Sequence, residues 1–309
     1  MYAYKNGSYT VMILDDGTKI RYNKLNIYKP NRVESMDIKI TNKCDMGCMM
    51  CHEDSTPNGA EANLINNPII NSIPPYTELA IGGGNPLSHP YLVEFLKYCK
   101  TKNLIANITV NKQHFLKDYT YIKSLFVDGL VSSIGVSVFD ITEEEIEKIK
   151  SVNSVCHVII GVTPMEVMYQ LANKNVKLLV LGYKTFRRGA DYYKINSNFI
   201  DTMQKTWAEF ISNAIKYKFY SVLSFDNLAI KQLHLKEKLS QEEWDSFFMG
   251  DDGIDGEFSS ASMYIDLVNG MFAENSCIPV NNRYYCSDKK FKNNVNKMFE
   301  FLLEKRLDK

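Results

Sequence analysis

Short apolar segments alternate with helical stretches along most of the chain, from about residue 33 to residue 225. This alternation predicts strands that pair in parallel, in a βα-repeat barrel or an open sheet. We count six βα units and the start of a seventh, fewer than the eight of a complete barrel. The expected strands are 36–41, 78–81, 105–110, 133–139, 156–162, 177–181 and 220–225.

Helix signals occupy the segments between these strands. Thr142-Glu143-Glu144-Glu145 forms a capping box, and Pro90 suits the first turn of a helix. The expected helices are 62–72, 90–102, 113–126, 142–150, 164–173 and 200–218.

The two ends of the chain follow other patterns. Turn signals at Asn6-Gly7 and Asp15-Asp16-Gly17 predict a β-meander over 1–33 that covers an edge of the sheet. After residue 228 the pattern predicts an α+β extension over 229–309, which leaves 34–228 as the repeat domain. The extension is expected to contain a helix capped by Ser240, a flexible lid or turn at 250–257, a hairpin at 263–274 and a final helix at 290–307.

Composition narrows the function classes. The chain has 309 residues, with 36 basic and 36 acidic side chains, so its net charge is zero and a broad nucleic-acid surface is not expected. Its apolar runs are too short for a membrane span. The cysteines number seven, and three of them are clustered, which indicates a reducing, cytoplasmic setting and not a disulfide framework.

Three cysteines, Cys44, Cys48 and Cys51, have the spacing C-x3-C-x2-C directly after the first expected strand. Thiolates are soft ligands for iron–sulfur clusters, zinc or copper. A [4Fe–4S] cluster usually takes four cysteines, so three leave one iron open to a small molecule. Zinc is the alternative, with His52 as a possible fourth ligand.

This loop resembles the signature of the radical S-adenosylmethionine (SAM) superfamily, which follows the first strand of a partial (β/α) barrel. The resemblance extends to the second strand, where Gly82-Gly83-Gly84-Asn85-Pro86 is similar to the family's Gly-Gly-Glu-Pro motif. That motif implies SAM binding by Gly82, Gly83, Gly84 and Asn85, with an amide oxygen accepting a hydrogen bond where glutamate is usual. The expected fold is therefore a partial (β/α)6 barrel of the radical SAM type.

Further cofactor contacts are implied by position in such a barrel, where ligands lie at the carboxyl ends of the strands. Ser137 and Asp140 are expected at the ribose or carboxylate of SAM, and Ile159 and Gly161 near its adenine. Asn111 stands where the family often has a Thr-Asn-Gly turn. For Ser137 and for 157–161, an ordinary strand is the alternative interpretation.

A basic turn, Lys184 to Arg188, follows the sixth expected strand. Lys184, Arg187 and Arg188 together suit an anion, because Arg presents a planar fork and Lys a point charge. They could hold the SAM carboxylate or an anionic substrate group, and we favour the substrate. A solvated surface turn is the alternative.

The remaining cysteines are interpreted differently. Cys277 and Cys286 cannot alone complete a second four-iron cluster, so no auxiliary cluster is expected. Cys99 and Cys156 fall on barrel elements and are expected in the core.

The resemblance implies an enzyme in which Cys44, Cys48 and Cys51 hold a [4Fe–4S] cluster that reductively cleaves SAM to a 5′-deoxyadenosyl radical. The radical then abstracts hydrogen from a substrate, and the electron comes from a flavodoxin- or ferredoxin-like donor. A peptide or protein is one possible substrate, and a nucleotide, nucleoside or other small molecule is another. A non-catalytic iron–sulfur or zinc module for binding or redox sensing is the remaining alternative.

Overall fold

The structure is a computed structural model that describes residues 1–14, 18–25, 27–247 and 260–307. The turn expected at 15–17 and the lid or turn expected at 250–257 therefore lie outside the described residues. Among the described residues, no helix is both long and apolar enough to cross a membrane.

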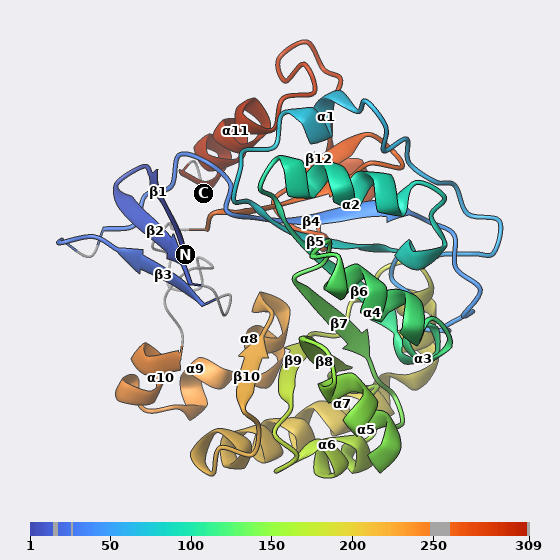
Figure 1. Cartoon of the computed structure of the whole chain (residues 1–309). Coiled ribbons are helices and arrows are strands. Elements are labelled where there is room, and N and C mark those ends of the chain that lie inside the picture. Colours follow the sequence, from blue (N-terminus) through green and yellow to red (C-terminus); the bar gives the residue numbers. More distant parts are fainter. Residues whose placement is uncertain (15–17, 26, 248–259, 308–309) are drawn as a thin grey trace.

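A ten-stranded sheet organises the molecule, with the order β10-β9-β8-β7-β6-β5-β4-β11-β12-β13 (Figure 1). Strands β4 to β10 lie side by side in chain order and pair in parallel, as the alternation predicts. The six-unit barrel itself is not confirmed. The bounds are β4 Ser35–Thr41, β5 Glu78–Gly83, β6 Ile105–Asn111, β7 Ser133–Ser137, β8 Ser154–Ile159, β9 Lys177–Leu181 and β10 Val222–Phe225.

The two faces of this sheet differ because side chains alternate along each strand. On the outer face, Ile38 of β4, Ile81 of β5 and Ile108 of β6 are buried in one hydrophobic core. The opposite face, which we call the concave face, includes Asp37, Ala80 and other side chains that keep contact with solvent. At β4 to β6 the concave face is therefore the side of the sheet that is open to a ligand.

Helices cover the outer face of the sheet (Figure 1). The capping box of α5 is confirmed, since the backbone N–H of Glu145 donates to Thr142 Oγ1 and Glu145 Oε2 accepts from the backbone of Thr142. The bounds are α1 Pro68–Asn71, α2 Leu92–Thr101, α3 Lys112–Lys117, α4 Tyr119–Val127, α5 Glu143–Lys150, α6 Met165–Leu171, α7 Arg188–Lys216, α8 Asn227–Leu233, α9 Leu235–Lys238, α10 Gln241–Phe247 and α11 Val295–Leu307, with short 3-10 helices η1 Pro86–Ser88 and η2 Val280–Asn282.

Several expected helices differ in extent. The helix expected over 113–126 is two helices, α3 and α4, separated at Asp118, the one expected over 290–307 begins at Val295, and the one expected over 90–102 begins at Leu92, so Pro90 precedes it. The helix expected over 62–72 is reduced to α1, because the extended backbone of Asn67 before Pro68 marks the start and Asn67 Oδ1 accepts from Ile69 N at 2.9 Å. The helix expected over 200–218 instead begins at Arg188. The basic turn therefore ends where α7 begins.

The C-terminal extension continues the large sheet. Strand β11 (Ser262–Asp266) pairs in parallel with β4, and β12 (Met271–Ala273) pairs antiparallel with β11, which confirms the expected hairpin. Strand β13 (Tyr284–Tyr285) follows β12. The domain bounds at 33 and 228 stay a prediction, and the sheet is continuous across the second of them.

The meander forms a sheet of its own, from β1 (Tyr2–Asn6), β2 (Tyr9–Ile13) and β3 (Lys19–Tyr22). It does not extend the large sheet, because β11 already occupies the free side of β4. The buried carboxylate of Glu34 joins the two sheets by accepting from Asn6 Nδ2 at 2.9 Å and Arg21 Nε at 3.0 Å.

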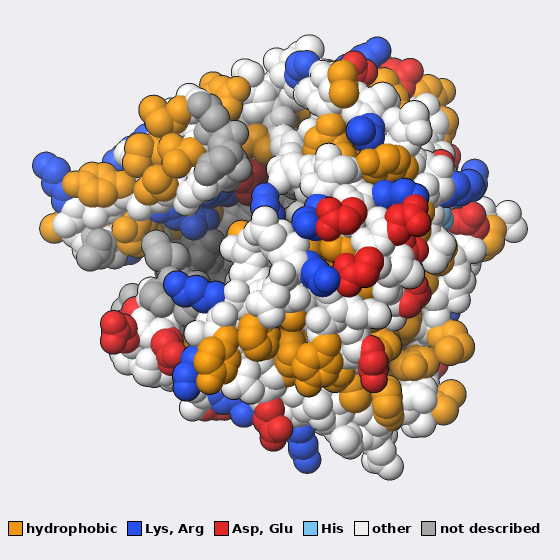
Figure 2. Space-filling model, turned by 60° about the horizontal axis from the view of Figure 1, so that its bottom comes forward, with side chains coloured by type: hydrophobic (Ala, Val, Ile, Leu, Met, Phe, Trp, Pro, Cys, Tyr) orange, Lys and Arg blue, Asp and Glu red, His pale blue; other side chains and the backbone are white. Residues whose placement is uncertain are grey.

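Surface charge follows the neutral composition. On the face shown in Figure 2, basic and acidic side chains are intermingled, and no large area of one sign stands out. Hydrophobic side chains gather on the arm at the left, where Figure 1 places the meander. Exposed apolar residues on that arm include Tyr2, Ile20 and Tyr22. Figure 2 thus shows no basic footprint for nucleic acid on this face.

Candidate active site

The three clustered cysteines lie in the loop after β4, at the carboxyl ends of the parallel strands. Cys44, Cys48 and Cys51 are all partly buried. The backbone N–H of Cys44 donates to Thr56 O at 2.8 Å, and that of Cys51 donates to Cys48 O at 3.2 Å. These bonds fold the loop back on itself and keep the three cysteines in one short, partly buried segment.

Electrostatics show that the thiols act on one another. Burial raises the pKa of the Cys44 and Cys48 thiols, and the charge of Cys51 raises both further. Thiolates that raise one another's pKa repel one another unless a cation lies among them, and a metal cluster would supply that charge. The soft donor set and its partial exposure therefore fit an iron–sulfur cluster. Cys99 and Cys156, by contrast, are buried in the core as expected.

The glycine-rich end of β5 packs against the strand that leads into this loop. The backbone N–H groups of Gly84 and Asn85 donate to Thr41 O at 2.8 Å and Lys43 O at 2.7 Å. A Cβ atom on Gly83 would overlap Thr41 O, and one on Gly84 would overlap Lys43 O. A Cβ atom on Gly82 would meet no atom within 4 Å. Gly83 and Gly84 are thus needed for packing, and Gly82 alone faces open space.

Asn85 lies next to Cys44 in the lining of a pocket of about 350 Å³. Its side-chain oxygen accepts from Leu87 N at 3.2 Å and caps η1. The residue that replaces the usual glutamate therefore already has a structural partner for its oxygen. Its role toward SAM stays a prediction.

The other expected cofactor residues come together at the carboxyl ends of adjacent strands. Asn111 and Ser137 are register partners on β6 and β7, and Asn111 also caps α3 by accepting from Gln113 N at 2.9 Å. Asp140 is exposed and ion-paired with the buried ammonium of Lys112. Their assignment to SAM stays a prediction.

The two residues expected near adenine differ in surroundings. Ile159 lies on the concave face, where its register partner is Leu181 of β9. Gly161 has a positive φ of 76°, and a Cβ atom there would press on Ile200 of α7. Packing against α7 thus explains the glycine without a ligand, and the adenine contact stays a prediction.

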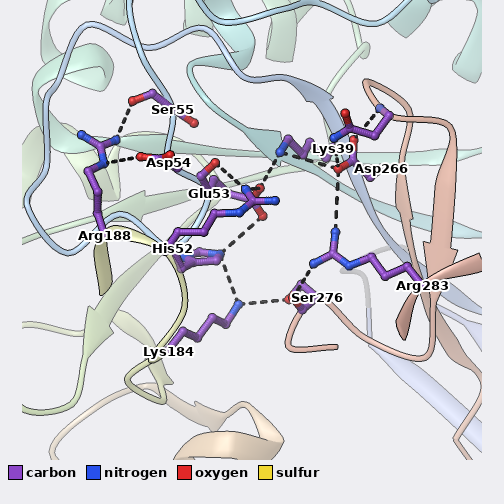
Figure 3. Close-up of polar contacts among 12 residues, drawn as sticks. Lys39, His52, Glu53, Asp54, Ser55, Lys184, Arg188, Asp266, Ser276 and Arg283 are labelled. Carbon is purple, nitrogen blue, oxygen red and sulfur yellow. Dashed lines mark hydrogen bonds and ion pairs between the residues drawn. The ribbon is translucent and has the colours of Figure 1, made fainter. Parts of the chain in front are cut away.

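The basic turn reaches the segment that follows Cys51, as Figure 3 shows for Lys184 and Arg188. Arg187 Nη1 donates to Glu53 O at 2.6 Å, and Arg188 Nη2 donates to Ser55 O at 2.5 Å. Arg188 Nε also pairs with Asp54 at 3.0 Å. The two arginines therefore fasten α7 to the cysteine loop, a role that the sequence analysis missed.

Lys184 connects two distant segments at the mouth of the concave face. Its ammonium lies 3.5 Å from His52 Nε2 and donates to Ser276 Oγ at 3.0 Å. Burial and the charges of Lys184, Lys39, Arg187 and Arg283 lower the pKa of His52 well below its usual range. His52 is therefore neutral and directed toward Lys184 (Figure 3).

A buried ion network joins the cysteine loop to strands β4 and β11. The sequence analysis did not predict it. Lys39, only 2% exposed, pairs with Glu53 at 2.7 Å and with Asp266 at 3.6 Å. Arg283 lies 3.7 Å from Asp266 and donates to Ser276 O at 3.1 Å. A lysine between Ile38 and Ile40 in an apolar strand is the sequence signal for it, because buried charges require partners.

A second missed group lies beside Cys44. The Cys44 thiol, the Asp45 carboxylate and the His114 ring have ligand atoms within 4.8 Å of one another. Asp45 Oδ1 is 2.6 Å from His114 Nε2, and this contact lowers the pKa of Asp45. The contact joins the cysteine loop to α3.

Neither a family model nor a curated protein matches the sequence. Solved structures of SuiB from Streptococcus suis match the fold. SuiB bound to S-adenosylmethionine has a TM-score of 0.53 at 13% identity, over 89% of this chain and 69% of that one. SuiB bound to the precursor peptide SuiA has a TM-score of 0.53 at 12% identity, over 89% and 66%. The chain thus has the fold of SuiB and spans about two thirds of its length, which confirms at the level of fold the expected resemblance.

Proposed function

We propose that the chain is a radical SAM enzyme that modifies a peptide. The observation that supports the proposal is the position of Cys44, Cys48 and Cys51, which all lie in the partly buried loop after β4, at the carboxyl ends of the parallel strands, in a fold shared with SAM-bound SuiB. Cys44, Cys48 and Cys51 would hold a [4Fe–4S] cluster. When bound, the cluster and SAM supply the one-electron cleavage and the hydrogen-abstracting radical, with the electron coming from a flavodoxin- or ferredoxin-like donor.

The chain's own residues position the reactants and keep water away. Gly82 leaves space for SAM on the concave face, and Ser137 and Asn111 offer polar contacts at the adjacent strand ends. Arg187 and Arg188 hold the cysteine loop through its backbone carbonyls. Because hydrogen abstraction needs close contact in a water-poor site, this fixed geometry is the protein's contribution.

A peptide is favoured over a nucleotide for two reasons. SuiB, which shares the fold, has been solved with a precursor peptide. The cations that would suit a phosphate group, Lys184, Arg187 and Arg188, already contact protein atoms of the loop and of Ser276. Their assignment to an anionic substrate group stays a prediction.

The test is anaerobic reconstitution of the full chain followed by mass spectrometry after incubation with SAM and a strong reductant. We expect about four iron and four sulfide per chain and the release of 5′-deoxyadenosine. Changing Cys44, Cys48 and Cys51 together to Ala should abolish both. The control is Cys99→Ala with Cys156→Ala, which removes two core thiols and should keep both. Full iron content in the triple variant would refute the proposal.

A further inference from the structure

Asp37 is an acidic residue on the concave face of β4, deeper than the cysteine loop. Its neighbours along the strand, Met36 and Ile38, are buried on the outer face, so the side chain of Asp37 points the other way. Across the sheet its register partners are Ala80 of β5 and Tyr264 of β11. Asp37 precedes the last residue of β4 by four positions, which places it roughly 13 Å below the strand end.

Asp37 differs from the acidic groups around it because it has no partner within the part of the chain that the structure describes. Glu53 and Asp266 pair with Lys39, and Asp226 accepts from Gly182 N at 2.9 Å and Ala229 N at 2.7 Å. Asp37 forms no hydrogen bond or ion pair with any residue that the structure describes. Its side chain is exposed, although protein surrounds it within the concave face.

The groups that face Asp37 do not compensate its negative charge when it is ionised. Burial raises the pKa of Asp37; Lys184 lowers it, and Asp226 and Glu53 raise it. Lys184 is engaged with Ser276 and His52 and does not come within ion-pairing distance. A carboxylate in a recess costs free energy unless a cation or hydrogen-bond donor meets it. The missing group is therefore positively charged.

We propose that Asp37 anchors a basic side chain, lysine or arginine, of the peptide substrate; this proposal rests on the proposed function. Depth supports a long side chain, because a peptide backbone at the mouth of the concave face must reach inward to Asp37. Lysine and arginine combine a long apolar stem with a charged head. Half-buried Leu179 and Leu181 on β9 add apolar surface to the same face for the stem.

The test measures binding to the full-length chain without turnover, by ligand-observed NMR with three blocked tripeptides. The probes are acetyl-Gly-Lys-Gly-amide, its arginine analogue and its norleucine analogue, which lacks the charge. We expect the basic probes to bind wild type roughly tenfold or more tightly than the norleucine probe, as for a charge-assisted contact. Asp37→Asn should erase this preference, and Asp37→Glu should restore part of it.

The matched control is Asp128→Asn, which removes the same charge from an exposed position at the end of α4. It should keep the full preference for the basic probes. Equal binding of all three probes by wild type, or an unchanged preference in Asp37→Asn, would overturn the proposal. SAM cleavage is assayed separately, so a chain that discriminates the probes but releases no 5′-deoxyadenosine would refute the proposed function and leave the anchoring site intact.

Discussion

The rim and the floor of the concave face differ in how their charged side chains are paired. We use rim for the cysteine loop with the contacts that hold it, and floor for Asp37 and its neighbours. At the rim, the loop after Cys51 is bound by Arg187 and Arg188 and supported by the buried Lys39–Glu53 pair. At the floor, the acidic side chain of Asp37 is accessible and without a partner among the described residues.

This difference suits two tasks, namely holding the cofactor at the rim and recognising the substrate at the floor. A cofactor is the same in every turnover, so a rim that is already fastened by Arg187, Arg188 and the Lys39–Glu53 pair can hold it in one geometry. A substrate enters and leaves, so the floor keeps a charged group that only the substrate satisfies. If this division is correct, variants at the rim should lose the cluster or SAM cleavage, and variants at the floor should change recognition and stability.

The largest expected effect comes from two glycines of β5 that differ in surroundings. Gly84→Val should lose both iron and SAM cleavage, because the new side chain would overlap the carbonyl of Lys43, next to Cys44. Gly82→Val should keep the iron and lose SAM cleavage, because its side chain fills the open space on the concave face. Iron content and 5′-deoxyadenosine release measure the two effects. Normal cleavage in Gly82→Val would place SAM elsewhere.

Much of the fold could be predicted from the sequence. The expected strand at 177–181 coincides with β9, and the other six parallel strands have bounds shifted by one to three residues, because alternation and turn residues are local signals. The start of α7 could not be predicted, since the segment after Arg188 is polar and its helix depends on packing against the loop after Cys51.

The site could be predicted only in part. Cysteine spacing and glycine runs appear directly in the sequence, so the cysteines and the glycine-rich strand end were found. The pairing of Lys39 with Asp266 joins residues 227 positions apart, through two strands that become neighbours only in the folded sheet. No local pattern contains that contact, and the same holds for the absence of a partner at Asp37.

The second prediction concerns the arginines of the rim. Arg188→Ala removes contacts to Ser55 O and Asp54, and a charge-assisted contact is worth about 1.5–3 kcal/mol. If Arg188 holds the loop, the reconstituted Arg188→Ala chain should lose iron to a chelator roughly tenfold faster than the wild type. If Arg188 instead holds an anionic substrate group, iron loss and substrate-free SAM cleavage should be unchanged, and only product formation should fall.

Lys194→Ala is the control for this comparison. Lys194 lies on the same helix, is 74% exposed and, among the residues that the structure describes, pairs only with Asp191 three residues away. An exposed pair of this kind contributes little, so iron loss and cleavage should both match wild type. A chelator effect of equal size in both variants would mean that the loss of a charge on α7, and not the contact with the loop, is responsible.

The smallest expected effect concerns the floor, where Asp37→Asn should increase stability at pH values above the raised pKa of Asp37. The folded chain raises the pKa of Asp37 above its ordinary value, mainly through burial. The folded state therefore holds this proton more tightly than the unfolded state, and stability falls as pH rises from the ordinary aspartate pKa to the raised one. Above that window the ionised carboxylate is a net cost, which asparagine does not carry.

Thermal unfolding of the wild type, Asp37→Asn and Asp128→Asn at several pH values measures this cost. The advantage of Asp37→Asn should be full above the raised pKa and shrink as pH falls through the window, while Asp128→Asn should follow wild type at every pH. If Asp37 instead had a structural role, Asp37→Asn would be less stable than the wild type. The substitution would then remove a carboxylate that satisfies a neighbouring group, which lowers the melting temperature. A less stable Asp37→Asn chain would therefore contradict the division between rim and floor, since Asp37 would then belong to the scaffold.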